Sequence, residues 1–411
     1  MPKAGLAGTS GSPDARGGRR RASPRRSGSR SFRADRPPPA LPDASPAAPA
    51  PAAPSTGRRV RVRDLLLPVA LSLGALGLVL WLTWEPGAFD AVRDTFRPAV
   101  LGLAVAALCG YLWMGALRFR HISRGALRAR DGLRGQLTWE FMSAVTPSAM
   151  GGAPLAAFFI ARENGLAVGR VSAIMLFTML MDQIWFATAI VALYLGALWL
   201  PVFPTGLGAA GVGTVAAYLG GMLVYIGFFA YATLVRPDLI GRVAGWIVRI
   251  PGLRRFQATV DRETAKLGEQ AVVLRGQPAG FYLTGALLTA TYWLLRYGTL
   301  LFVALSFTRD LRPVLMVFRT AGLWLAGLIM PTPGGSGGIE GLFVLFVAPL
   351  LPEGYGGPVL LAWRGLAYYG VLIVGLFVAG RAVRALLSGD APSAPAPATS
   401  LASPTAPETS P

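Results

Sequence analysis

The stretch Pro331-Thr332-Pro333-Gly334-Gly335-Ser336-Gly337-Gly338-Ile339-Glu340 interrupts a run of apolar residues that otherwise has the composition of a membrane helix. Its two prolines and four glycines prevent a regular helix, because proline lacks a backbone donor and glycine favours irregular dihedral angles. Backbone groups left unpaired at membrane depth need protein or a water-filled cavity around them. The interruption therefore predicts a cavity, and Glu340 at its edge is a costly intramembrane charge that points to a function.

The same pattern occurs once more, in the first half of the chain. Thr146-Pro147-Ser148-Ala149-Met150-Gly151-Gly152 shares the form T-P-x-x-x-G-G with Thr332-Pro333-Gly334-Gly335-Ser336-Gly337-Gly338, and both lie between apolar segments of half the usual length. Paired interruptions in the two halves of a membrane protein are a sequence signal of a transport site. The candidate substrate-binding residues of the two breaks are therefore Thr146, Pro147, Gly151, Gly152, Thr332, Pro333, Gly334, Gly335, Gly337 and Gly338. The glycines would present bare backbone N–H groups to an anionic headgroup.

The composition restricts the class of protein. Of 411 residues, 53% are hydrophobic and only 14% are charged, which is too apolar for a soluble domain. One cysteine, Cys109, and one histidine, His121, exclude an internal disulfide, a structural zinc site and a cysteine–histidine nucleophile pair. We therefore expect no metal and no other cofactor, and an enzyme is less favoured than a transport protein.

The chain divides into three expected regions. Residues 1–63 carry 14 Lys/Arg against three Asp in a Pro/Ala/Arg-rich context, which is typical of a disordered cytoplasmic tail. Phe32 is the one aromatic residue of this tail, so there is no aromatic interleaving to support nucleic acid as a partner, and the charge favours anionic lipid. Residues 64–387 would form the transmembrane domain, with halves at 64–204 and 205–387, and residues 388–411 a second disordered tail.

Hydropathy predicts an all-α polytopic membrane protein with about six full transmembrane helices and two broken helical hairpins. The expected spans are 65–84, 98–117, 171–200, 206–235, 278–305 and 358–379, and the expected hairpins are 137–161 and 313–351. Arginine-rich loops, one of them from Arg118 to Arg134, are expected on the cytoplasmic side of the membrane. The number of spans then places both termini on the cytoplasmic side as well. Each half then has an odd number of crossings, so the second half enters with opposite orientation, as an inverted repeat with a site at the midplane.

Few ionisable residues lie within the expected membrane segments, and each is costly in lipid. They are Glu140, Asp182, Arg296, Arg319, Glu340 and Arg364. One interpretation is a polar pocket in which the arginines hold a phosphate bidentately and the carboxylates balance them. The other is a set of buried structural pairs, for example Arg319 with Glu340. Glu140 could instead lie at the cytoplasmic interface, and Arg364 could extend outward to the membrane surface.

Three segments carry a resemblance to a known family. They are Thr146-Pro147 with Gly151-Gly152-Ala153-Pro154, the block from Pro331 to Glu340, and Ala362-Trp363-Arg364-Gly365-Leu366-Ala367-Tyr368-Tyr369. These resemble the signature segments of the lysylphosphatidylglycerol synthase transmembrane family, over about 65–387. In bifunctional members a membrane flippase part precedes a cytosolic aminoacyl-transferase. Here only low-complexity residues follow the last span, so the resemblance implies lipid translocation without the transferase, in a bacterial-type cytoplasmic membrane.

We therefore predict a translocase that moves an anionic phospholipid or a lipid-linked headgroup between leaflets. Without a nucleotide-binding motif, movement would be passive or coupled to a proton or ion gradient, with Glu340 or Asp182 as proton carriers. Two alternatives stay open: a membrane-embedded glycosyl- or aminoacyl-transferase that acts on lipid, and a scaffold of the cell envelope that transports nothing.

Overall fold

The computed structural model describes residues 62–82, 93–145, 152–204, 208–234, 276–328 and 332–380, with the isolated positions 236, 239 and 330. Over these residues the chain is all-helical and contains no strand, which confirms the expected all-α class. The C-terminal tail, nearly all of the N-terminal tail, and the break residues Thr146, Pro147 and Gly151 lie outside the described residues.

Five helices of the described chain are long and apolar enough to cross a membrane. They are α3 (Pro98–Ile122), α6 (Val168–Gly196), α7 (Gly208–Leu234), α10 (Ala279–Phe307), and a last helix built from α13 (Gly356–Arg364), the π-helical η5 (Gly365–Gly370) and α14 (Val371–Val378). The remaining expected span, 65–84, corresponds to α1 (Val62–Leu82), whose described apolar segment is Ser72–Trp81. Large apolar side chains such as Val224 and Phe377 are exposed, as expected of a multi-pass membrane protein.

Both predicted hairpins are present. The first consists of α4 (Ala129–Val145) and α5 (Gly152–Glu163). In the second, α11 (Pro313–Gly327) is followed by the short turn η3 (Pro333–Gly335), α12 (Gly338–Phe346) and η4 (Ala348–Leu350). The helix is thus broken in the proline–glycine block, as predicted.

The backbone of the second break requires glycine. Gly334, Gly335 and Gly337 have φ angles of 58°, 69° and 81°, in the left-handed region that other residues seldom adopt. At Gly152 a Cβ atom would lie 2.4 Å from the backbone nitrogen of Ser143, so glycine also permits the close approach of α5 to α4.

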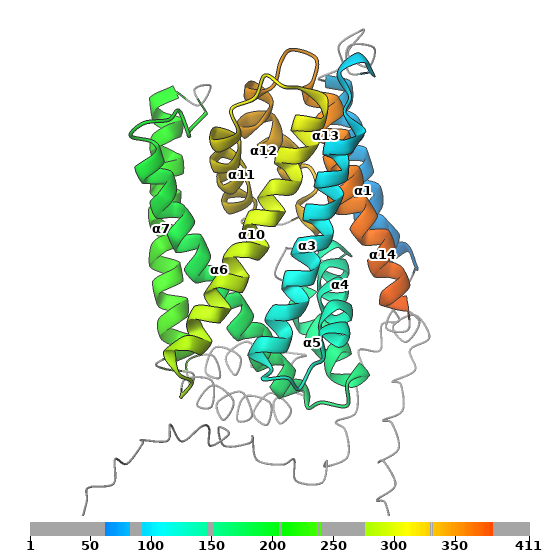
Figure 1. The fold of residues 1–411 in the computed structure, drawn as a ribbon, viewed down its shortest axis with the longest axis vertical. Coiled ribbons are helices and arrows are strands. Elements are labelled where there is room, and N and C mark those ends of the chain that lie inside the picture. Colours follow the sequence, from blue (N-terminus) through cyan, green and yellow to red (C-terminus); the bar gives the residue numbers. More distant parts are fainter. Residues whose placement is uncertain are drawn as a thin grey trace, which may run out of the picture. The chain divides into compact units, whose positions relative to one another are not determined.

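The two halves contribute matching contacts around a central helix pair. Helices α3 and α10 pack against each other and run in opposite directions, and the two hairpins lie toward opposite ends of these helices (Figure 1). In the first half α3 packs on α4 and α6, while in the second half α10 packs on α11 and α13. Helix α4 also contacts η3, so the inner end of the first hairpin meets the turn of the second.

Candidate functional site

A cavity of about 120 Å³ lies where the inner ends of the two hairpins meet, and we call it the central cavity. Its wall is formed by α3, α4, α10, α11, the η3 turn, α12, α13, η5 and α14. The polar side chains in this wall come from both halves of the chain: Tyr111, Glu140, Ser143, Arg296, Thr299, Arg364 and Tyr368. Of the predicted site residues, Arg296, Arg364, Gly334 and Gly335 line this one cavity.

Arg296 forms an ion pair with Glu140 inside the central cavity. Its Nη1 atom donates to Glu140 Oε1 at 2.7 Å and its Nη2 atom to Oε2 at 3.3 Å. Tyr292 Oη and Gln136 Nε2 donate to the same Oε1 atom, each at 3.1 Å. Glu140 therefore lines the same cavity as Arg296 and holds it there as an ion pair.

Aromatic rings surround the guanidinium of Arg296. Its Cζ atom lies 4.4 Å from the ring centroid of Trp324 and 4.9 Å from that of Tyr111, within the range of a cation–π contact. The rings cover much of the guanidinium, and the side chains of Arg296 and Glu140 are only 15% and 17% exposed, so the electrostatic interactions of the pair act in a medium less polar than bulk water. Arg296 Nε and Trp324 Nε1 are buried donors that have no hydrogen-bond partner among the described residues.

Glu340 pairs with Arg364, with its Oε1 atom 2.9 Å from Arg364 Nε. Its Oε2 atom accepts the backbone N–H of Gly337 at 2.7 Å, so the carboxylate also fixes the glycine loop at the start of α12. Arg364 lies 4.0 Å over the ring of Tyr368 and donates to Ser72 Oγ at 3.3 Å, and it points into the molecule and not outward. Glu340 is completely buried and is not part of the cavity wall.

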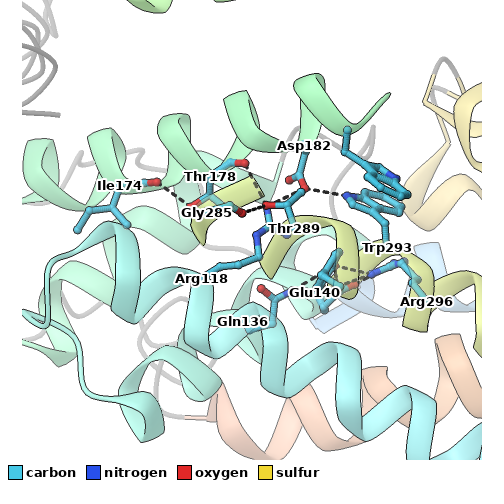
Figure 2. A network of polar contacts seen from close by, with 12 residues as sticks. Arg118, Gln136, Glu140, Ile174, Thr178, Asp182, Gly285, Thr289, Trp293 and Arg296 are labelled. Carbon is cyan, nitrogen blue, oxygen red and sulfur yellow. Dashed lines mark hydrogen bonds and ion pairs between the residues drawn. The ribbon is translucent and has the colours of Figure 1, made fainter. Parts of the chain in front are cut away.

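Asp182 lies outside the cavity wall, in a second polar cluster (Figure 2). Its Oδ1 atom accepts from Arg118 Nη2 at 2.7 Å and from Trp293 Nε1 at 2.8 Å. Arg118 also donates to the backbone oxygen of Thr178 at 3.1 Å, and its guanidinium lies 4.7 Å from the ring centroid of Tyr292. Tyr292 thus contacts both arginines, Arg118 through its ring and Arg296 through its hydroxyl.

The sequence analysis missed Arg118, which it assigned to a cytoplasmic loop. Helix α3 continues to Ile122, five residues beyond the expected end at Leu117, and this extension buries Arg118 to 2% exposure. The signal was the aspartate in the middle of an apolar span, because a buried carboxylate requires a cationic partner.

Arg319 does not reach the central cavity. It is buried on α11, where it donates to the backbone oxygens of Pro201 (2.8 Å), Phe203 (3.4 Å) and Phe346 (3.3 Å). The expected pairing of Arg319 with Glu340 is wrong, because Glu340 takes Arg364 instead. The contacts of Arg319 join the end of α12 to the connection after α6, which is a structural role.

Of the remaining predicted residues of the second break, Thr332, Gly337 and Gly338 do not line the cavity. A Cβ atom on Gly338 would lie 2.2 Å from Met330 Sδ, so this glycine permits close packing within the hairpin. Thr332 Oγ1 is buried without a hydrogen-bond partner in the described chain, and Pro333 begins the η3 turn. Among the described residues, no group of three His, Cys, Asp or Glu side chains is arranged to hold a metal ion.

Comparison with known proteins agrees with the resemblance of the motifs. No curated protein matches the chain. The family model for the lysylphosphatidylglycerol synthase TM region matches residues 65–375, which is more than half of the 411-residue chain and includes both hairpins and the whole cavity wall. The chain therefore belongs to the lysylphosphatidylglycerol synthase transmembrane family.

Proposed function

We propose that the protein moves an anionic lipid between the leaflets of a membrane, and that the phosphate of the headgroup binds in the central cavity. The observation that carries this proposal is that Arg296 and Arg364, from distant parts of the chain, line one cavity together with the turn of an interrupted hairpin. Arginine presents a planar fork of donors that matches a phosphate group. Intramembrane arginines that face a common cavity are typical of a substrate pathway.

The donors of the cavity suit an oxygen-rich anion. Arg296 Nε and Trp324 Nε1 are buried and make no hydrogen bond to any described residue, and a buried donor without a partner costs about 1–3 kcal/mol. Phosphate oxygens would supply the missing acceptors. Gly334 and Gly335 have no side chains, so the backbone of the η3 turn can approach the same ligand closely.

We infer that the two halves form an inverted repeat. The helices correspond in order, α3 with α10, the α4–α5 hairpin with the α11–α12 hairpin, and α6 with the last helix. Their contacts also correspond, since α4 packs on α14 and α11 packs on α6. In such a repeat, rocking of one half against the other opens a central site first to one leaflet and then to the other.

Headgroup passage can be measured in proteoliposomes that contain phosphatidylglycerol with a fluorescent acyl chain, by reducing the outer-leaflet label with dithionite. We expect the wild-type protein to move labelled lipid from the inner to the outer leaflet, where dithionite then reduces the label. Arg364→Gln combined with Glu340→Gln, which avoids a completely buried Glu340 without its cation, should slow this by about tenfold or more, because it removes one charge-assisted contact of about 1.5–3 kcal/mol. Arg309→Gln, at an exposed loop arginine, is the matched control.

Replacing Arg296 alone leaves Glu140 buried without its cation, so the variant to use is Arg296→Gln with Glu140→Gln, which removes both charges. We expect this protein to fold, as judged by size-exclusion chromatography, and to lose lipid movement. Wild-type rates in both double variants would contradict the assignment of the site. A purified protein that transfers a sugar or an amino acid to lipid would favour the transferase alternative.

A further inference from the structure

Glu140 is a carboxylate that both lines the central cavity and neutralises an arginine there. Its side chain is 17% exposed, whereas that of Glu340 is completely buried. An anion that enters the cavity to bind Arg296 therefore finds that Glu140 already accepts hydrogen bonds from the guanidinium of Arg296.

The guanidinium of Arg296 does not have enough free donors to bind both Glu140 and a phosphate bidentately. Two of its nitrogens, Nη1 and Nη2, donate to Glu140, and only Nε is without a partner in the described residues. A phosphate that binds this fork bidentately must displace at least one oxygen of Glu140. The displaced carboxylate would then be an ionised group in a site of low polarity without its cation, which is unfavourable.

Protonation of Glu140 removes this penalty. In the resting pair, Arg296 (+1) and Glu140 (−1) sum to zero. With a phosphodiester (−1) on Arg296 the sum is −1 when Glu140 stays ionised, and zero when Glu140 binds a proton. Charge interactions are strong where water is excluded, so the neutral combination is favoured.

We propose that a lipid phosphate replaces Glu140 on Arg296 and that Glu140 binds one proton as it is replaced, so that an anionic lipid and a proton cross the membrane together. This inference rests on the proposed function. The proton passes from water in the compartment to which the cavity is open onto a carboxylate oxygen of Glu140. No other covalent bond changes, and the reverse exchange on the far side releases lipid and proton and restores the ion pair.

The polar and charged groups nearest Glu140 come from α3, α4, α10, α13 and η5. Helix α4 contributes Gln136, α10 contributes Tyr292 and Arg296, and α3 contributes Tyr111, with Arg118 behind the ring of Tyr292. Arg364 and Tyr368 face the cavity from α13 and η5, whereas the lining residues of η3 and α14 are Gly334, Gly335, Val371 and Leu372, which do not titrate. The charged residues of α5 and α1 lie in the terminal turns of these helices: Arg162, Glu163, Arg63 and Asp64.

The two carboxylates expected from the sequence to carry the proton are less suitable. Glu340 is absent from the cavity wall and holds both Arg364 and the Gly337 N–H, so its protonation would loosen the glycine loop. Asp182 accepts from Arg118 and Trp293 in the neighbouring cluster and does not line the cavity. Both are positioning residues in this scheme.

The test is proton uptake on binding, measured at pH 7 in weakly buffered detergent solution with a pH indicator. The ligand is dihexanoyl phosphatidylglycerol, which carries one negative charge, and glycerophosphoglycerol is the same diester without acyl chains. We expect the wild-type protein to take up one proton per lipid bound. Glu140→Gln should bind the lipid at least as tightly and take up none, because Arg296 no longer has a competing anion. The matched control Glu353→Gln, at an exposed glutamate, should behave as wild type.

Each result decides the question. Binding to the wild-type protein without proton uptake, proton uptake that persists in Glu140→Gln, or loss of lipid binding in that variant would overturn the inference. Equal binding of glycerophosphoglycerol, with the same proton uptake, would assign the exchange to a free phosphodiester instead of a lipid. If the wild-type protein neither binds the lipid nor moves it in vesicles, the proposed function itself fails, which is a separate outcome.

A transmembrane pH gradient gives a second measurement in sealed vesicles. A lipid of charge −1 that moves with one proton transfers no net charge, so a difference of one pH unit should shift its leaflet ratio about tenfold toward the alkaline side. Glu140→Gln should leave the ratio near one whatever the gradient. A wild-type ratio that does not respond to pH, while labelled lipid equilibrates, would contradict the coupling.

Discussion

Gly334 is the position where the η3 turn comes closest to the last helix, and its replacement by alanine tests the geometry of the central cavity. A Cβ atom there would lie 2.5 Å from both Cε2 and the hydroxyl oxygen of Tyr368. The ring is held in place, because it contacts Arg364 at 4.0 Å and its hydroxyl donates to the backbone oxygen of Ala144 at 3.4 Å. Tyr368 thus joins both hairpins, and Gly334→Ala must displace it.

The expected cost has two parts. Gly334 has a φ angle of 58°, and the left-handed conformation costs an alanine about 1–2 kcal/mol. Displacement of a packed ring adds about 1–3 kcal/mol. Gly334→Ala should therefore lower the free energy of unfolding by about 2–5 kcal/mol in the wild-type background, but by only about 1–2 kcal/mol when Tyr368→Ala removes the ring.

The measurement is a double-mutant cycle on the detergent-solubilised protein, with the free energy of unfolding taken from denaturant titrations of the four proteins. Gly341→Ala is the control: no atom lies within 4 Å of its Cβ position, and alanine is the better helix former. A coupling energy near zero between Gly334→Ala and Tyr368→Ala would refute the close contact. Movement of phosphatidylglycerol in vesicles should fall in Gly334→Ala, because the displaced ring narrows the cavity that both residues line.

Three further variants separate the roles of the buried charges. Asp182→Asn should destabilise the protein by about 3–5 kcal/mol, since it leaves Arg118 buried without a counter-ion, and Arg118→Met in the same chain should recover most of the loss in denaturant titrations. Glu340→Gln unpairs Arg364 and should cost a similar amount, which Arg364→Met would offset. Arg319→Lys should cost about 1–3 kcal/mol through lost carbonyl contacts, with lipid affinity by calorimetry unchanged; a large fall in affinity would place Arg319 in the binding site.

The sequence predicts the helices of this protein well because the relevant signals are local. Apolar runs of about 20 residues fix the spans, and the proline–glycine block stops α11 at Gly327 and starts α12 at Gly338. The observed ends mostly fall within a few residues of those expected. The largest shift in the central pair is at α3, where a series of basic residues was interpreted as a loop although the helix continues to Ile122.

Pairing of the buried charges is much less predictable. Arg319 and Glu340 belong to one hairpin, and their proximity in sequence suggested a pair, yet Glu340 takes Arg364 from the last helix. Which arginine meets which carboxylate depends on the rotation and tilt of packed helices, and a single sequence does not determine these. The uncharged partners of Glu140 were missed as well: Tyr292 reaches it from α10, across the interior of the protein, whereas Gln136 lies one turn before it on α4.

The two halves of the proposed repeat have their helices in a similar order but differ in charge, and this difference bears on how a lipid would pass. Arg118 lies near the C-terminal end of α3, whereas the corresponding end of α10 has no charged residue after Arg296. The acidic residues also lie on different arms, Glu140 on the first arm of its hairpin and Glu340 on the second. The end of α3 therefore carries a buried ion pair, whereas at the end of α10 Arg97 donates to the backbone oxygens of Leu305 and Thr308. A symmetric rocking motion would consequently expose two chemically different entrances, so the rates of lipid entry from the two leaflets should differ even without a gradient.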